Sequence, residues 1–262
     1  MPLSRRFFRR VKSSVLRPEA AYRLYLRLKF GTGQLAARPE SPLPNGTLKS
    51  RGEWQRVLAD AKAARLPLHR GDEKNWDHLA AVFAILGSTT TSARVLDAGA
   101  EFYSNVLPAL FAYGYRNLYG INLSFTEEAR RGPIRYLPGD ITRTIFADDF
   151  FDAVACMSVI EHGVPLEGYF REMYRVLKPG GLLITSTDYY PTQIDTQGKT
   201  AHGAAIKVFD KAEIEQMLRL TEEIGFESTG EVDLECSERP VRWEQFGLEY
   251  SFVIFTLRKP AA

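Results

Sequence analysis

Cysteine is almost absent from the 262-residue chain, which has only Cys156 and Cys236. Both lie in strand-like runs, so neither a disulfide framework nor a cysteine-rich zinc site is available, and a reducing compartment is favoured. No apolar run reaches the roughly 18 to 20 residues that a membrane-spanning helix needs. No apolar stretch of secretory-signal length follows the basic start of the chain. We therefore expect a cytoplasmic protein.

The composition provides enough apolar material for one large globular domain, because 45% of the residues are hydrophobic and 25% are charged. Collagen, coiled coil and general disorder are excluded. Gly, Pro and Ser break the periodicity between Gly31 and Gly52. We accordingly divide the chain into an N-terminal arm (1–30), a linker (31–52) and a main domain (53–262).

The net charge of +2 is unevenly distributed. Residues 1–30 hold nine Lys or Arg against Glu19 alone, which gives +8 and leaves −6 for the remainder. As a helix, the start of the arm would be basic and amphipathic, a pattern typical of contact with an anionic membrane surface. A solvated arm, a docking helix and an organellar transit peptide fit the same pattern.

Helical spacing alternates with short apolar runs along the main domain. Strands separated by helices predict an α/β fold with a doubly wound, mostly parallel, seven-stranded sheet and helices on both faces. We expect strands at 94–97, 118–122, 134–137, 151–157, 181–186, 229–236 and 248–257. We expect helices at 53–65, 75–86, 103–113, 126–130, 166–177 and 211–224, the last begun by a capping box of Asp210 and Glu213.

Ligands of such sheets bind outside the carboxyl ends of the strands, near the point where the strand order reverses. The residues that end strands are therefore the candidates. The first strand ends in Asp97-Ala98-Gly99-Ala100, and the second ends in Asn122-Leu123. The third is followed by Gly139-Asp140-Ile141, and the fourth ends in Met157-Ser158 before Glu161-His162.

In order and spacing, this series resembles the class I S-adenosylmethionine-dependent methyltransferases of the small-molecule type, over about residues 93–257. The resemblance implies S-adenosylmethionine as cofactor and S-adenosylhomocysteine as product. It implies that Asp97, Ala98, Gly99 and Ala100 cradle the methionine part and that Asn122 and Leu123 face the ribose. Gly139, Asp140 and Ile141 would hold the adenine, and Met157 with Ser158 would line the donor pocket.

Two positions depart from the family pattern. The first turn normally has two or three alternating glycines, whereas only Gly99 stands here. A carboxylate normally ends the second strand, whereas Asn122 offers one carbonyl acceptor and two donors. We interpret both as variation within a binding family.

Methyl transfer to a hydroxyl needs alignment and one base, and we expect Glu161 and His162 to supply the catalytic groups. His162 could also be a metal ligand or a residue at a helix start, but we predict no metal. The long segment after the fifth strand suggests a substrate wall with Tyr189, Tyr190 and His202. Asn75 and Trp76, before the sheet, are secondary candidates for covering the cofactor.

The expected function is methyl transfer to a small-molecule acceptor, with a hydroxyl of a sugar, lipid-linked glycan or secondary metabolite as the leading class. A non-catalytic partner subunit of the same fold is the alternative. A nicotinamide oxidoreductase is less favoured because the later glycines are missing. Nucleic-acid substrates are disfavoured because the main body is acidic. Peripheral membrane contact through the arm is a further expectation, and the sequence does not indicate an oligomeric state.

Overall fold

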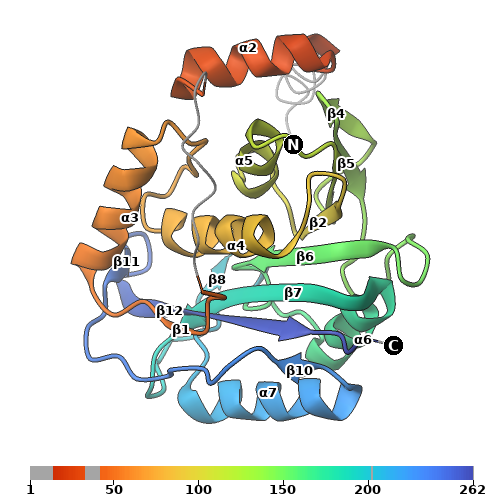
Figure 1. Cartoon of the computed structure of the whole chain (residues 1–262). Helices are drawn as coiled ribbons and strands as arrows, with labels where there is room; N and C mark the ends of the chain where they lie inside the picture. The colour runs from red at the N-terminus through yellow and green to blue at the C-terminus, as the bar shows by residue number, and fades with distance from the viewer. Residues whose placement is uncertain (1–13, 33–41, 202, 262) are drawn as a thin grey trace.

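The computed structural model describes residues 14–32, 42–201 and 203–261. Its centre is a twisted sheet in the order β1-β12-β7-β6-β2-β3-β5-β4 (Figure 1). The central strands are β2 (Arg94–Ala98), β3 (Asn117–Asn122), β5 (Ile134–Pro138), β6 (Phe151–Met157) and β7 (Leu177–Tyr189), and they pair in parallel. β12 (Leu248–Arg258) joins β7 antiparallel. The order reverses at β2, which lies between β3 and β6.

Helices cover both faces of the sheet, as predicted (Figure 1). One face carries α4 (Asn75–Ser88) and α5 (Val106–Ala112), with α2 (Glu19–Phe30) and α3 (Arg51–Ala63) outside them. The other face carries α6 (Leu166–Val176) and α7 (Lys211–Ile224). Neighbouring strand residues point to opposite faces, so Val95 and Leu96 belong to two separate buried clusters. The doubly wound α/β prediction is confirmed.

Local signals placed several boundaries correctly. The side chain of Asp210 accepts from the backbone of Glu213, and the reciprocal bond completes the capping box at the start of α7. α6 ends one residue before the predicted position, ahead of Lys178-Pro179-Gly180-Gly181. α5 begins three residues later than predicted.

Two predicted elements were wrong. In place of a helix at 126–130, β4 (Ala129–Arg131) pairs antiparallel with β5, and Gly132 makes the turn at φ +54°. In place of a strand over 229–236, only β10 (Glu227–Ser228) pairs with β12. The outer edge of β12 is shared by β10, β1 (Gly46–Thr47) and β11 (Val241–Trp243), so no length of edge remains for a longer strand. With these short strands, the sheet formed by the described residues has ten strands rather than the predicted seven.

Part of the predicted arm and linker belongs to the fold. In the arm, α2 buries Tyr22 and Leu26 against the core, while residues 1–13 lie outside the described residues. In the predicted linker, β1 joins the sheet and Leu48 is completely buried. No helix in the described part of the chain combines the length and apolarity that crossing a bilayer requires. A small hairpin of β8 (Thr200–Ala201) and β9 (Ala204–Ala205) stands apart from the sheet.

Candidate functional site

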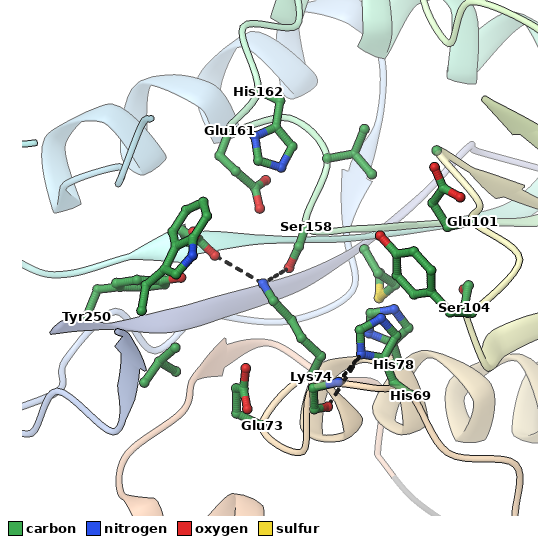
Figure 2. Close-up of a pocket in the computed structure, with 18 of the residues that line it drawn as sticks. His69, Glu73, Lys74, His78, Glu101, Ser104, Ser158, Glu161, His162 and Tyr250 are labelled. Carbon is green, nitrogen blue, oxygen red and sulfur yellow. Dashed lines mark hydrogen bonds and ion pairs between the residues drawn. The ribbon is translucent and has the colours of Figure 1, made fainter. Parts of the chain in front are cut away.

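A cavity of about 280 Å³ opens at the carboxyl ends of β2, β6 and β7. Parallel strands place their carboxyl ends at one edge of the sheet, so turns that are distant in sequence meet there. The cavity is walled by the turn after β2, the segment after β6, the residues around the start of α4, and the edge formed by β11 and β12 (Figure 2).

The turn after β2 brings a buried acid to the cavity. Asp97 is 3% exposed and accepts a 2.8 Å hydrogen bond from Ser104 Oγ. Burial raises the pKa of Asp97 to about 6, although Ser104 and His78 oppose the shift. Glu101 lines the same cavity; its Oε1 accepts from Ser124, and its buried Oε2 has no hydrogen-bond partner in the part of the chain that the structure describes. This turn therefore presents carboxyl groups suited to a cationic ligand group.

Gly99 is required in this turn for two reasons. Its φ of +94° is a conformation that side chains rarely tolerate, and a Cβ there would lie 2.3 Å from Cγ2 of Val159. Val159 follows β6, so the ends of β2 and β6 are in close contact across the cavity floor.

The segment after β6 turns sharply at Ser158, a non-glycine residue with φ +53°. Such backbone strain persists only where the surroundings hold it, and it clusters at functional sites. The turn directs Glu161 into the protein, where it is 2% exposed and accepts a 3.1 Å hydrogen bond from Thr187 Oγ1. Burial and the nearby Asp188 raise the pKa of Glu161 to about 8, against the opposing effect of Lys74.

Lys74 occupies the centre of the cavity (Figure 2). Its Nζ donates to Ser158 Oγ at 2.6 Å and to Asp188 Oδ1 at 3.2 Å, and it lies 4.0 Å from the ring centroid of Phe252. Burial opposes its charge, but Asp188, Glu161 and Asp77 outweigh burial and raise the pKa of Lys74. Lys74 thus shares the cavity lining with Glu161 and Asp188, and a third acid, Asp77, acts on it from α4.

A buried aspartate and its neighbouring histidine support this centre from α4. Asp77 is buried and hydrogen-bonds to His78 Nδ1 at 3.0 Å and to Ser186 Oγ at 2.5 Å. Burial would raise its pKa, but His78, Lys74 and Ser186 prevail and lower the pKa of Asp77 to about 2. The ring of His69 packs against that of His78 at an interplanar angle of 38°, with ring centroids 4.7 Å apart, and burial lowers the pKa of His69 to about 3.

The structure places the predicted cofactor residues in two groups. Asp97, Gly99, Met157 and Ser158 line the cavity, while Ala98 and Ala100 are buried within the turn. The others lie outside the cavity lining, at the ends of β3 and β5: Asn122, Leu123, Gly139, Asp140 and Ile141.

At the ends of β3 and β5, the side chains of Asn122 and Asp140 already make hydrogen bonds within the protein. Asn122 Nδ2 donates to the Gly99 carbonyl at 3.0 Å, and its Oδ1 accepts from Ser124 N. Asp140 Oδ1 accepts from the backbone and hydroxyl of Thr142. Leu123, which directly follows β3, is a large apolar side chain that is 79% exposed.

These groups fit S-adenosylmethionine at both ends. Asp97 and the Oε2 of Glu101, to which no described residue hydrogen-bonds, suit the ammonium of the methionine part, because a buried carboxylate requires a compensating charge. Exposed Leu123 offers an apolar surface for the adenosine part, and Asn122 and Asp140, at the ends of the neighbouring strands β3 and β5, offer polar groups.

Both predicted catalytic residues line the cavity. Of the predicted substrate residues, Tyr189 is completely buried and donates to the Leu234 carbonyl at 2.6 Å. Tyr190 is half-buried, is not among the residues that line this cavity, and packs under Arg239. His202 lies outside the described residues.

The secondary candidates are tied into the scaffold. Asn75 hydrogen-bonds to the backbone around His69 and Gly71, and Trp76 Nε1 donates to Glu53. Within the described ranges, no three His, Cys, Asp or Glu side chains cluster so that they could hold a metal ion.

Sequence reasoning missed Lys74, Asp188, Tyr250 and Trp243 as cavity residues. The available signal was a Lys-x-x-Asp pair at the start of an otherwise apolar helix, Lys74 to Asp77. Tyr250 and Trp243 carry no such signal, since aromatic residues in a strand are equally typical of a core.

Comparison with known proteins gives one family match. Residues 96–185 match the family model described as a methyltransferase domain. The chain is 30% identical over 119 residues to a sterol 24-C-methyltransferase of Debaryomyces hansenii and 31% identical over 118 residues to that of Yarrowia lipolytica. These matches cover 42% of this chain, and the chain spans less than a third of the length of these relatives, 31% and 30%.

Among solved structures, the [4+2]-cyclase SpnF superposes with a TM-score of 0.51 at 17% identity, covering 85% of this chain and all of that one. An S-adenosylmethionine-dependent methyltransferase from Mesorhizobium loti superposes with a TM-score of 0.50 at 17% identity, covering 71% of this chain and 97% of that one. At such identities the likeness shows the fold alone, and the pairing of a cyclase with a methyltransferase illustrates that this fold does not fix the reaction.

Proposed function

The chain belongs to the class I S-adenosylmethionine-dependent methyltransferase family, and from this premise we propose that it methylates a hydroxyl group of a small-molecule acceptor. The observation that carries the proposal is the buried carboxyl of Glu161, which faces Lys74 in a cavity whose opposite wall is the Asp97 turn (Figure 2). A base and a donor site on facing walls are what transfer to a hydroxyl requires.

S-adenosylmethionine, when bound, supplies a methyl group on a positively charged sulfur. The residues that would hold it are Asp97 and Glu101 at the methionine part, and Asn122, Leu123 and Asp140 at the adenosine part. Met157 and Ser158, at the end of β6, would line the space between the donor and acceptor sites.

Glu161 is the proposed base. In its carboxylate form it takes the proton of the acceptor hydroxyl, and its raised pKa makes that carboxylate a stronger base than an exposed glutamate. Lys74 opposes the pKa rise and so keeps a fraction of Glu161 ionised near neutral pH. His162 lines the same cavity and is the second acid–base candidate.

The acceptor proposed is a hydroxyl of a sugar, a lipid-linked glycan or a secondary metabolite. Carboxyl groups at Glu161 and Asp188 beside the rings of Trp243 and Tyr250 provide hydrogen-bond acceptors and flat apolar faces, a combination that suits a hydroxylated ring. The relatives named sterol 24-C-methyltransferases support an acceptor with a lipid part. A lipid-linked glycan satisfies both considerations.

The first experiment is calorimetric titration with S-adenosylmethionine and S-adenosylhomocysteine, with NADH as the control. We expect micromolar binding of the first two alone. Transfer of a labelled methyl group is then measured with free sugars, glycolipid extracts and sterols. Label on a carbon atom of any acceptor, rather than on an oxygen, would refute the hydroxyl proposal.

Absence of cofactor binding in folded protein would favour the alternative, a non-catalytic partner subunit. Contact between Val159 and the Gly99 turn, and the occupied hydrogen bonds of Asn122, are the observations that favour this alternative.

We also infer peripheral membrane contact through the outer face of α2. Leu24 and Leu28, one turn apart, are 56% and 79% exposed, and Arg27 lies beside them. An exposed apolar pair flanked by cations is typical of helices that lie on anionic bilayers.

A further inference from the structure

A second cavity, of about 330 Å³, lies between α2 and the segment from Glu101 to Asn105. We propose that it binds an organic phosphate, meaning a phosphomonoester joined to an aromatic or aliphatic group. The cavity shares Glu101, Tyr103 and Ser104 with the proposed donor cavity but extends to the opposite side of the turn after β2.

The main observation is the buried guanidinium of Arg131 in the wall of this cavity. Arg131, on β4, is 7% exposed. Its Nη1 donates to the Phe102 carbonyl at 2.7 Å, while its Nε has no hydrogen-bond partner among residues 14–32, 42–201 and 203–261. None of the ion pairs between described residues includes Arg131. A buried charge without a counter-charge is costly, so the site favours an anion.

The surrounding charges add to this preference. Lys29 and Arg70, both exposed, line the cavity with Arg131. Among the described lining residues Glu101 is the one acid, so these side chains carry a net +2. A phosphomonoester carries about −1.5 to −2 at neutral pH, which matches this charge better than a carboxylate does. The planar donors of a guanidinium also suit phosphate oxygens.

The remaining walls indicate that the phosphate is attached to an apolar group. Tyr22, Tyr25, Phe30, Phe102 and Tyr103 surround the cavity. The guanidinium carbon of Arg131 lies 4.4 Å from the ring centroid of Phe102, and that of Arg70 lies 5.5 Å from the ring centroid of Tyr103. Cations stacked on aromatic rings form a surface that accepts a flat or aliphatic group beside an anion. A cavity of this size and lining is poorly suited to inorganic phosphate alone.

The test is calorimetric titration of the full chain with phenyl phosphate, octyl phosphate and inorganic phosphate, without S-adenosylmethionine. Arg131→Gln removes the buried charge, and Arg130→Gln is the matched control, because Arg130 is the exposed neighbour on the same strand and pairs with Glu128. A double variant, Lys29→Gln with Arg70→Gln, changes only exposed rim residues and decides the question if Arg131→Gln fails to fold.

We expect an organic phosphate to bind at least about tenfold more tightly than inorganic phosphate, because each factor of ten requires only about 1.4 kcal/mol of apolar contact. Arg131→Gln should weaken it by about tenfold to a hundredfold, the range for a hydrogen bond to a charged group. The rim variant should weaken it several-fold and Arg130→Gln should not. Preference for octyl over phenyl phosphate, or the reverse, identifies the attached group.

No binding of either organic phosphate by folded wild type would overturn the proposal. Equal binding of inorganic phosphate, or an equal loss in Arg130→Gln, would also overturn it. The readout involves neither methyl transfer nor cofactor, so its failure is separate from failure of the proposed function.

Discussion

Glu161→Gln is the substitution that tests the proposed base most directly, because it should lower activity while raising stability. The change keeps the shape of the side chain and an oxygen that can accept from Thr187 Oγ1, but it removes the ionisable group. When a catalytic base is buried where its charged form is disfavoured, its removal should both lower activity and raise stability.

The stability effect follows from the raised pKa. A group whose pKa is higher in the folded state than in the unfolded state stabilises the fold below the unfolded value, and that contribution is lost as the pH rises through the folded value. For Glu161 the two values are 4.5 and about 8. At about 1.4 kcal/mol per pH unit, wild type loses about 3 kcal/mol between pH 4.5 and 7 and about 4 kcal/mol by pH 8. The Glu161→Gln variant has no such loss, because its amide does not ionise.

The assay is urea unfolding of wild type and variant between about pH 5 and pH 8, with methyl transfer measured in parallel. The stability difference in favour of Glu161→Gln should widen by about 3 kcal/mol across this range. Turnover should fall by a factor of about 10² to 10⁴, the usual contribution of a general base. Wild-type turnover should rise with pH through about 8.

Glu223→Gln, which changes an exposed glutamate on α7, is the control and should change neither property. If the stability curves of Glu161→Gln and wild type run parallel at every pH, the pKa argument is refuted. If turnover persists in Glu161→Gln, the base is another group, of which His162 is the first to examine.

Other expectations concern the donor site, the buried charges and α2. Asp140→Ala should weaken S-adenosylmethionine binding more than His162→Ala, which should mainly lower turnover; equal losses of affinity in calorimetry would contradict this division. Wild-type affinity for S-adenosylmethionine should increase as the pH rises through about 6, where Asp97 ionises, and Asp97→Asn should be weaker and independent of pH. Lys74→Met should lower the unfolding free energy by about 3 to 5 kcal/mol because Asp188 loses its partner. Adding Asp188→Asn to Lys74→Met should restore part of that free energy. If Lys74→Met alone is as stable as wild type in urea, the pairing is disproved. Leu24→Gln with Leu28→Gln should reduce sedimentation with phosphatidylserine vesicles because it removes the exposed apolar pair. Undiminished sedimentation would argue against membrane contact through α2.

The sequence alone predicted the elements whose signals are local. Short apolar runs between helical segments predicted the parallel strands. The pair Asp210 and Glu213 predicted the start of α7, and Gly180 with Gly181 indicated the end of α6. Strand ends also located Asp97, Gly99 and Ser158, because in a parallel sheet each strand end meets the same edge. These features depend on residues a few positions apart.

The tertiary structure decided whatever depends on contacts between distant residues. Pairing of β1, β10 and β11 along one edge of β12 excluded the strand expected at 229–236. Lys74 and Asp188 lie 114 positions apart in the chain, and only folding brings their charges to 3.2 Å. The same holds for the raised pKa of Glu161, since burial is a property of the packed molecule and not of a residue. Local sequence signals thus determined which strand ends form the edge of the sheet that lines the cavity. Long-range packing determined which charged side chains meet at that edge.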